Sequence, residues 1–577
     1  DSGTFTLRLH NTTDKAQNLK INLSTDNLEL AGEAIPETTL EPDQTVTLKY
    51  PYRVTASGDA HIKAEISGDN TQSLERRIPI RAAALPQVRT QYQRLDGGAT
   101  LEYSDLRDAR LSLNSGIPYN AEPYQKQLAD YPLGCSEQTT GKLWGLIGAE
   151  KADRDAIHAA ENRLANLAHW DGSYSLWGYG KENRWLTAYI GEALIQLQKR
   201  QELLNPSQLT RLLGQLRSGN DGSYRPETAH EDSYAYYTLA YAEEPIRGNL
   251  LRYHREAGDQ LSLSDSLDIA TALALLGEYQ TASERLAGGS SEDDAKTYGY
   301  SSTTSLAAHN LTRLKQMQTQ WQSVADDPRD TLSLIQKMHD EESEKLRTVL
   351  ASDDYLSTQE LAWLARLSSL ASQLPDDTLI QIDGKNATLG EMKKGEYNGN
   401  VRITNPGKQP LWLNSYDLHN PPAEAASSNG WDIAIRYEDR EGNILDPDAL
   451  PNNTDIRITA TFTQKGDYAD YHSELIYMYP VPAGIILTPL RGKSPEQDEQ
   501  DDRVQYRYHE NRDDRHIAAF TIDYNRRDEY RDRGSFKYTI NARTTRAGTW
   551  HAPGASIENM YHPEEHARQA AQTIHIR

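Results

Sequence analysis

The stretch Tyr131–Thr140, YPLGCSEQTT, contains the only cysteine in the 577-residue sequence, three positions before a glutamine. A lone cysteine excludes an intrachain disulfide framework and a zinc site built from several thiolates. The Tyr-Pro-Leu-Gly approach is extended and the following SEQTTGKLWGLIG predicts a helix, so we expect Cys135 at a helix N-terminus. The unpaired N–H groups and the helix dipole stabilise a thiolate there, which makes this sulfur reactive.

Three interpretations of Cys135 remain open from its surroundings. It can be a small buried hydrophobe, which is the usual fate of a lone cysteine. It can be a catalytic nucleophile, whose base would come from a distant histidine because no local Cys-His pairing is present. In a first helical turn, residues three apart face each other, so the sulfur can also reach the Gln138 carbonyl and form an internal thioester with loss of ammonia. The Cys-x-x-Gln spacing alone also occurs by chance.

The charge balance indicates the class of partner. The chain has 61 Lys plus Arg against 84 Asp plus Glu, a formal net charge of -23. This charge opposes binding to nucleic acid or to an anionic membrane, so we expect proteins or small molecules as partners. No apolar run reaches the length of a membrane helix, and the sequence opens directly on an alternating strand pattern. We therefore expect a mature chain or a fragment of a longer one, with several domains.

Hydrophobic periodicity changes twice along the chain. Alternating segments such as TFTLRLH and TVTLKYPYRV predict strands up to about residue 115. Between about 117 and 375, segments such as LTAYIGEALIQLQKR and SLDIATALALLGEYQ have apolar residues three and four apart and predict helices. Asn205-Pro206 is typical of a helix N-cap followed by proline. From about 377 the strand pattern returns, which predicts a helical domain inserted between β regions.

The helical region contains a partial repeat. Trp170-Asp-Gly-Ser-Tyr174 recurs as Asn220-Asp-Gly-Ser-Tyr224, and both copies fall between expected helices. A repeat of this length fits a two-helix unit, in which the Asp-Gly pair makes a tight turn with positive φ at glycine. Stacked helical hairpins predict an α/α toroid, although two copies of such a common turn can also arise by chance.

The wider motif around the cysteine resembles a known family. Gly134-Cys135-Ser136-Glu137-Gln138 is similar to the G-C-x-E-Q thioester motif of the α2-macroglobulin and complement family, most closely the bacterial α2-macroglobulins. Ser136 departs from the Leu of many bacterial relatives, without affecting the bond chemistry. Further matches in the expected order are Trp185-Leu-Thr-Ala-Tyr189, Tyr479-Pro-Val-Pro-Ala-Gly484 and Pro553-Gly-Ala-Ser-Ile-Glu-Asn-Met-Tyr561. The resemblance covers most of the chain.

The resemblance implies a multidomain fold. It consists of β-sandwich macroglobulin-like domains plus a CUB-type β domain that carries an inserted all-α thioester domain, an α/α toroid. The implied segments are a macroglobulin-like β-sandwich at 1–86, the first part of the CUB-type domain at 87–116, the toroid at 117–376, the second part of the CUB-type domain at 377–425, and a final macroglobulin-like domain at 426–577.

The resemblance also implies site residues. Cys135 and Gln138 would be the thioester partners, and Gly134 and Glu137 complete the motif. The alternative interpretation of Glu137 is a favourable charge in the first helical turn. Tyr131 and Met560 match positions that shield the bond from water, and ordinary interdomain packing is their alternative. Some family members use a toroid histidine to direct the acyl group to hydroxyls. His230 lies in the corresponding region, and a turn histidine bonded by Glu231 or Asp232 is the competing interpretation.

The implied function is that of a broad-spectrum protease trap, an endopeptidase inhibitor of bacterial defence. Proteases would be captured covalently through surface lysines, and small amines would react with the thioester. The chain would be a single-use reagent rather than an enzyme, without cofactor or metal. We expect a periplasmic monomer, lipid-anchored through an N-terminal region outside this sequence, with a cell-wall synthesis partner in the envelope. The alternative is a non-reactive envelope scaffold or interaction protein, with the thioester absent or spent.

One further motif suggests a different chemistry. His562-Pro-Glu-Glu-His566 fits the H-x-x-E-H pattern of zinc peptidases, in which two histidines on one helix hold the metal. No third ligand on a second helix is evident in the sequence. A solvated charged turn after a strand is therefore the favoured interpretation.

Overall fold

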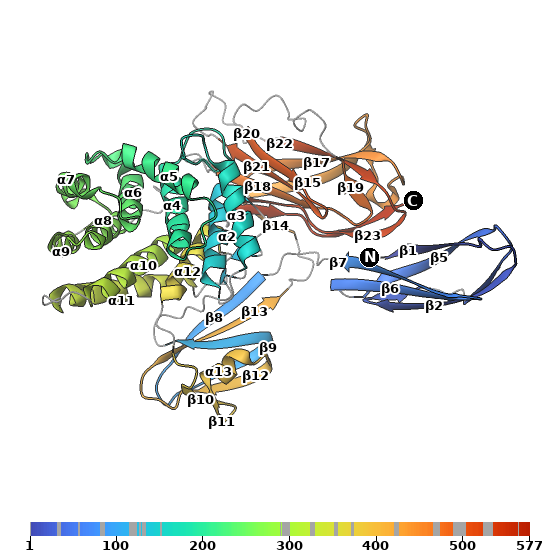
Figure 1. Cartoon of the computed structure of the whole chain (residues 1–577), viewed down its shortest axis with the longest axis horizontal. Coiled ribbons are helices and arrows are strands. Elements are labelled where there is room, and N and C mark those ends of the chain that lie inside the picture. The colour runs from blue at the N-terminus through green and yellow to red at the C-terminus, as the bar shows by residue number, and fades with distance from the viewer. Residues whose placement is uncertain are drawn as a thin grey trace. The chain divides into compact units, whose positions relative to one another are not determined.

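The computed structural model combines β domains with one helical domain and divides into two compact units (Figure 1). One unit comprises Asp1–Leu85, Asn420–Met560 and Glu564–Arg577, and the other comprises Pro86–His419 and Tyr561–Pro563. The structure describes residues 2–31, 36–55, 58–80, 87–114, 124–125, 128–129, 134–149, 153–288, 290, 300–322, 329–350, 356–370, 374–419, 426–465, 473–488, 504–522, 535–562 and 565–577. Within these ranges, no helix is both long and apolar enough to cross a membrane.

The N-terminal domain is formed by two antiparallel sheets. Their strand orders are β1-β5-β3 and β4-β2-β6-β7. Alternate side chains of both sheets, among them Leu7, Ile21, Leu48 and Ile66, form its core, as the sequence alternation predicts. The strands are β1 (Ser2–His10), β2 (Gln17–Asp26), β3 (Leu28–Leu30), β4 (Glu37–Leu40), β5 (Thr45–Val54), β6 (Gly58–Ser67) and β7 (Thr71–Ile80).

A second β domain is interrupted by the helices. Its sheet has the order β11-β10-β12-β9-β13-β8, so strands from before and after the helical region pair with one another. β13 lies between β8 and β9, and β12 pairs with β9. This pairing confirms that the helical domain is inserted into a β domain. The elements are β8 (Gln87–Leu95), β9 (Thr100–Asn114), β10 (Leu379–Ile382), β11 (Lys385–Thr388), α13 (Leu389–Lys394), β12 (Tyr397–Thr404) and β13 (Leu411–His419).

The helices form a closed ring. The even-numbered helices α2 to α12 pack against one another in chain order, and α12 packs back against α2. Helices α3, α9 and α11 each pack against the preceding even-numbered helix, α5 packs against both α4 and α6, and α7 packs against α8. The helices are α2 (Ser136–Gly148), α3 (Arg154–Leu167), α4 (Arg184–Lys199), α5 (Pro206–Gly219), α6 (Ala229–Tyr241), α7 (Arg247–Ala257), α8 (Leu263–Leu275), α9 (Tyr279–Ala287), α10 (Thr303–Trp321), α11 (Arg329–Leu350) and α12 (Thr358–Leu370).

The repeated turns behave as the sequence predicts. Gly172 and Gly222 have φ of 93° and 96°, in the left-handed region that glycine tolerates. Tyr174 after the first turn is fully buried, whereas Tyr224 is half-buried. The predicted capping by Asn205 is only partly right, because α5 begins at Pro206 but the Asn205 side chain makes no cap hydrogen bond. Its Oδ1 instead accepts from Ser207 Oγ at 2.7 Å.

The C-terminal domain is again built from β-sheets. Its larger sheets have the orders β14-β25-β24-β18-β21-β20 and β16-β15-β17-β22-β19. Phe462, Tyr477, Phe520, Phe536 and Tyr538 fill the core between them. The strands are β14 (Ser427–Asn429), β15 (Trp431–Glu438), β16 (Ile444–Leu445), β17 (Asp455–Gln464), β18 (Ser473–Pro480), β19 (Ile485–Leu487), β20 (Val504–Asn511), β21 (Arg515–Ile522), β22 (Ser535–Thr544), β23 (Gly548–Ala552), β24 (Ser556–Asn559), β25 (His566–Arg568) and β26 (Gln572–Ile576).

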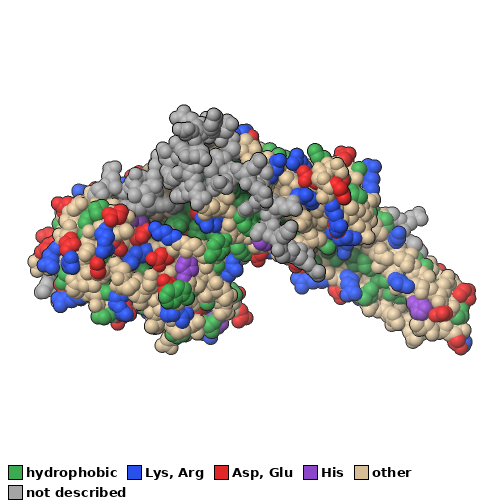
Figure 2. All heavy atoms as spheres, turned by 90° about the horizontal axis from the view of Figure 1, so that it is seen from above, with side chains coloured by type: hydrophobic (Ala, Val, Ile, Leu, Met, Phe, Trp, Pro, Cys, Tyr) green, Lys and Arg blue, Asp and Glu red, His purple; other side chains and the backbone are tan. Residues whose placement is uncertain are grey.

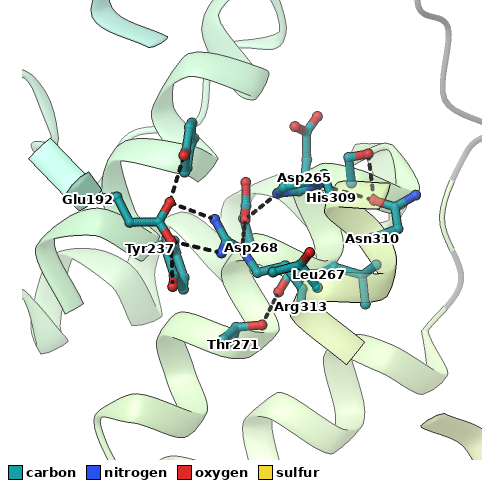
Figure 3. A network of polar contacts seen from close by, with 12 residues as sticks. Glu192, Tyr237, Asp265, Leu267, Asp268, Thr271, His309, Asn310 and Arg313 are labelled. Atoms are coloured by element: carbon teal, nitrogen blue, oxygen red, sulfur yellow. Dashed lines mark hydrogen bonds and ion pairs between the residues drawn. The ribbon is translucent and has the colours of Figure 1, made fainter. Parts of the chain in front are cut away.

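The interior of the helical ring contains charged groups. Glu192 on α4 forms ion pairs with Arg313 of α10 and Arg366 of α12. Figure 3 shows how Arg313 lies between Glu192 and Asp268, and its Nε is 2.7 Å from Asp268 Oδ1. Burial alone would raise the pKa of Glu192, but the two guanidiniums outweigh it and lower the pKa to about 2. These pairs connect helices that are adjacent (α8 and α10), two positions apart (α4 and α12) or opposite (α4 and α10) in the ring.

The surface carries charges of both signs. Figure 2 shows acidic and basic side chains interspersed over the described part of one face. The net negative charge is therefore not gathered into a single patch on that face.

The buried ion pairs predict a large effect of Glu192→Leu. This substitution leaves Arg313 and Arg366 buried without their shared carboxylate, so the helical domain should lose about 3–5 kcal/mol of stability. Urea denaturation followed by circular dichroism measures the loss. The matched control is Glu341→Gln on α11, which removes an exposed pair with Lys337 and should cost under about 1 kcal/mol. Equal small losses for both variants would contradict this role of the buried pairs.

Candidate functional site

Cys135 and Gln138 meet at the first turn of α2. Cys135 is the N-cap residue, with φ of -68° and ψ of 174°, and the helix begins at Ser136 as predicted. The Gln138 backbone N–H donates to Cys135 Sγ at 3.4 Å, and the Cys135 backbone N–H donates to Gln138 Oε1 at 3.3 Å. This reciprocal arrangement is a capping box with cysteine in place of the usual serine or threonine. It holds the thiol and the carboxamide on the same side of one helical turn.

Neighbouring segments fix the position of this turn. The Ser136 backbone N–H donates to Leu176 O, and Ser136 Oγ donates to Ser175 O, both at 2.8 Å. Both acceptors lie in the loop that carries the first Asp-Gly-Ser-Tyr repeat. On the other side, Arg163 Nε of α3 donates to Gly134 O at 3.0 Å. The residues on both sides of Cys135 are therefore bonded to the surrounding domain.

The turn is closed to solvent. Cys135 and Glu137 are 0% exposed, and Gln138 is 1% exposed. An activated acyl group persists only where water is kept away from it. The burial of both side chains therefore provides the environment that a thioester requires.

Glu137 is a buried acid in the same turn. Its Oε2 accepts a hydrogen bond from Thr358 Oγ1 of α12 at 2.8 Å. Its Oε1 has no hydrogen-bond partner among the residues that the structure describes. Burial raises the pKa of Glu137 to about 7, and the Thr358 hydrogen bond offsets this only in part. Glu137 is the acidic residue of the first turn of α2, but the raised pKa means that its charge is fully present only above about pH 7, so its role as a favourable charge stays a prediction.

The N-terminal turns of the ring helices are bonded to one another. Thr358 at the start of α12 contacts Glu137 of α2, and Ser302 before α10 donates to Glu360 of α12 at 2.6 Å. A further ion pair joins the first turns of α4 and α6, between Arg184 Nε and Asp232 Oδ1 at 3.2 Å. These contacts place the N-terminal ends of the ring helices at one mouth of the ring. Cys135 and Gln138 lie at this mouth.

His230 lies at the same mouth, in the first turn of α6. Its Nδ1 is 2.8 Å from Asp265 Oδ1 of α8, and its ring stacks on Trp185 of α4. The interpretation that Glu231 or Asp232 bonds this histidine is wrong, because residues one and two positions on in a helix face other directions. The His230 side chain is 13% exposed, but its Nε2 atom is buried.

Of the two residues predicted to shield the bond, Met560 lies within the described residues and Tyr131 does not. Met560 is buried directly after β24, and its backbone N–H donates to Glu474 O at 2.9 Å. Tyr131 lies outside the described residues, so its predicted position over the bond stays a prediction, as does the shielding by Met560.

The zinc-peptidase alternative conflicts with the local structure. His566 is the first residue of strand β25, so His562 and His566 do not lie on successive turns of one helix as that pattern requires. No cluster of metal-binding side chains occurs within the described ranges.

Sequence reasoning missed several residues at the site. These residues are Thr358, Arg163 and Asp265. They belong to helices other than those of their partners at the site, and no spacing rule connects them to the motif. The capping-box pattern Ser357-Thr-Gln-Glu360 marks the start of α12 and is the only available signal.

Comparisons with known proteins agree with this architecture. Residues 114–229 match the family described as A-macroglobulin TED domain, and residues 430–564 match Bacterial Alpha-2-macroglobulin MG10 domain. Alpha-2-macroglobulin of Escherichia coli strain K12 is 24% identical over 100% of this chain and 37% of its own length. Alpha-2-macroglobulin of Xylella fastidiosa strain Temecula1 is 22% identical over 98% of this chain and 37% of its length. The chain belongs to the bacterial α2-macroglobulin family.

Solved structures show the same fold. The native E. coli α2-macroglobulin fragment from domain MG7 to the C-terminus covers 100% of this chain, with 97% of that fragment matched, a TM-score of 0.79 and 23% identity. Salmonella α2-macroglobulin reacted with methylamine covers 100% of this chain, with 40% of that structure matched, a TM-score of 0.78 and 21% identity. The present chain therefore corresponds to the C-terminal portion of an α2-macroglobulin, and it spans about a third of the curated relatives.

The buried carboxyl predicts a pH-dependent stability. An unfolded chain releases the Glu137 proton near its ordinary pKa of 4.5, whereas the folded chain keeps it until about pH 7. Stability should therefore fall between about pH 4.5 and pH 7, by about 3 kcal/mol from this group. Glu137→Gln should lack this contribution, while all other groups are unchanged. Urea midpoints of both proteins at pH 5 and pH 8 measure the difference, and identical pH slopes would contradict the buried-acid assignment.

Proposed function

We propose that this chain carries an internal thioester between Cys135 Sγ and Gln138 Cδ, and that it captures proteases covalently through this bond. The observation that supports the proposal most strongly is the reciprocal hydrogen bonding of the two residues in a buried turn. The turn lies within the segment that matches the A-macroglobulin TED domain. The similar Salmonella protein is described as reacted with methylamine, which agrees with amine reactivity.

The capture step is acyl transfer. A lysine amine of the protease attacks the Gln138 carbonyl carbon, a new amide bond forms, the attacking nitrogen loses one proton to solvent, and the carbon–sulfur bond breaks. Cys135 leaves as a thiolate, which the N–H groups at the start of α2 stabilise, because the Gln138 backbone N–H already donates to Sγ. One acyl group is consumed for each capture. The chain is therefore a single-use inhibitor and not a turnover enzyme, with no cofactor required.

Cleavage by the target protease would provide the trigger. In this proposal the cut releases the buried turn to solvent, and the amine then reaches the carbonyl. Tyr131 and Met560 belong to the proposal as the apolar cover of the intact bond. The proposed setting is the periplasm, with a lipid anchor in a region outside this sequence, a monomeric state and a cell-wall synthesis partner. Fractionation of cells tests the periplasmic setting and the anchor, and sedimentation of the purified protein tests the monomeric state.

The competing proposal is a non-reactive envelope scaffold. It is favoured only if the bond is absent or spent in the native protein. The capping box is compatible with this scaffold, because it forms whether or not the thioester exists.

Labelled methylamine tests the acyl transfer directly. The native chain should incorporate one methylamine at Gln138 and release one thiol at Cys135, as located by peptide mass spectrometry. Cys135→Ser should incorporate none, whereas Met560→Ala should incorporate the label faster because the cover is reduced. Absence of label in freshly prepared native chain would favour the scaffold. Label at residues other than Gln138 would contradict the assigned bond.

His230 extends the proposal to the choice of acceptor. Its place at the mouth and its bond to Asp265 support a role in which the imidazole takes the acyl group and passes it to a hydroxyl. His230→Asn should then lower incorporation of glycerol relative to methylamine by about tenfold or more. The ratio of the two labels in one competition experiment measures this effect. An unchanged ratio would assign His230 to packing against Trp185.

A further inference from the structure

One tryptophan differs from the others in its exposure. All nine tryptophans lie within the described residues, and Trp170 is 92% exposed, whereas seven of the others are at most 8% exposed and Trp412 is partly buried. Tryptophan is on average a highly buried residue, because its ring is large and mostly apolar. A ring this exposed gains almost no burial energy within the chain, so its position has another reason.

The internal repeat shows that the turn does not require this ring. In both copies an aspartate Oδ1 accepts from the serine backbone N–H, at 3.0 Å in the first copy and 2.9 Å in the second, and both glycines have positive φ. The position of Trp170 is taken in the second copy by Asn220, which is 2% exposed and donates to Asp232 O. The same turn therefore forms with a buried polar residue in place of the tryptophan.

Hydrogen bonds hold the backbone on both sides of Trp170. The His169 backbone N–H donates to Ser173 O at 2.9 Å, and the Gly172 backbone N–H donates to His169 O at 3.1 Å. The His169 ring is also bonded, with Nδ1 3.1 Å from Ser173 Oγ and Nε2 3.1 Å from Ser175 Oγ. A ring presented on a fixed backbone loses little conformational freedom when a partner covers it.

Tyr179 adds a second exposed ring to the same loop. Residues 168–183 connect α3 to α4, and Tyr179 in this loop is 48% exposed. Its backbone oxygen accepts from Ser175 Oγ at 2.9 Å, so it belongs to the same hydrogen-bonded segment as His169. Tryptophan and tyrosine are enriched at the centres of protein–protein interfaces, because they bring a large contact area with few rotatable bonds. The two rings therefore give this loop the character of a protein-binding surface.

The loop is bonded directly to the turn of the proposed thioester. The Ser136 backbone N–H donates to Leu176 O, and Ser136 Oγ donates to Ser175 O, both at 2.8 Å. Trp170 lies five residues before Ser175, and five steps of about 3.8 Å set an upper limit of about 19 Å between their Cα atoms. The pairing of residues 168 and 174 folds this segment back and shortens that distance.

This proximity identifies the occupant of the surface. A standard protein interface covers about 800 Å² on each partner, which corresponds to a circle about 32 Å across. A protein whose lysine reaches Gln138 therefore covers a surface large enough to include Trp170.

Charge supports a protein rather than a membrane as the occupant. The net charge of -23 opposes binding to an anionic membrane. Within the loop, the exposed Lys181 and Glu182 carry one charge of each sign. The loop therefore repels protein partners of neither charge.

We propose that Trp170 and Tyr179 dock the protease that the thioester captures. Both rings contact the surface of the protease and hold one of its lysine amines beside the turn that carries Gln138. Docking positions this amine and so accelerates acyl transfer to a protein, whereas a small free amine needs no docking. This inference rests on the proposed thioester capture and assigns the surface that recognises the captured protein.

The test is a competition between trypsin as the protein acceptor and methylamine as the small acceptor, with the purified full chain. Peptide mass spectrometry quantifies both products at Gln138. Trp170→Ala and Tyr179→Ala should each lower the ratio of trypsin to methylamine by about tenfold, because each removes an interface anchor. Methylamine alone should label both variants at the native rate. Trypsin cleaves after Lys and Arg, so neither substitution changes a cleavage site.

Two further variants serve as controls. Leu204 is 47% exposed in the loop after α4, at the end of that helix away from the mouth, and Leu204→Ala should leave the ratio unchanged. Trp170→Tyr keeps a large exposed ring and should retain most of the native ratio. The urea midpoint of Trp170→Ala should equal that of the native chain, because the ring is almost fully exposed, and this separates docking from folding.

The results that would overturn the inference are distinguishable. A native ratio in both alanine variants would remove the docking role and leave the thioester standing. An unchanged ratio with Trp170→Ala sedimenting at half the native mass would assign the rings to a contact between two copies of the chain. Methylamine label without any trypsin conjugate in the native chain would overturn protease capture. Native chain that incorporates neither acceptor would overturn the thioester itself and this inference with it.

Discussion

The capping of α2 by its own thiol and carboxamide is the interaction on which the site depends. A helix start has N–H groups without intrahelical partners, and here Cys135 Sγ and Gln138 Oε1 accept two hydrogen bonds from that turn. The same geometry that satisfies the helix end holds the sulfur beside the amide carbonyl. An ordinary capping requirement thus places the two groups of the proposed bond together without a separate binding site.

The rest of the helical domain serves to hold and close this turn. The ring of helices brings several N-terminal turns to one mouth. Side chains of α12 and α3 contact the motif, and a backbone carbonyl after the first Asp-Gly-Ser-Tyr repeat accepts a hydrogen bond from it. Deeper in the ring, buried arginines and carboxylates connect α4, α10 and α12. A turn that is both fixed and dry would preserve the proposed thioester until the surrounding structure is disturbed.

Much of this arrangement follows from local sequence patterns. Periodicity predicts the strands, the helices and the insertion, and the Cys-x-x-Gln spacing predicts the contact within the turn. Contacts across the ring do not follow, because Thr358 lies 221 positions from Glu137 and only the closed ring brings them together. The partner of His230 was predicted wrongly for the same reason, since Asp265 belongs to the next helix of the ring. The raised pKa of Glu137 also depends on burial by distant segments.

The intact mass of freshly purified native chain tests the thioester most directly. We predict a mass lower than that of the sequence by one ammonia, with no titratable thiol until an amine is added. Addition of methylamine should then raise the mass by one methylamine and expose one thiol per chain. A full sequence mass with a titratable Cys135 thiol from the outset, in protein never exposed to amines, would contradict the account.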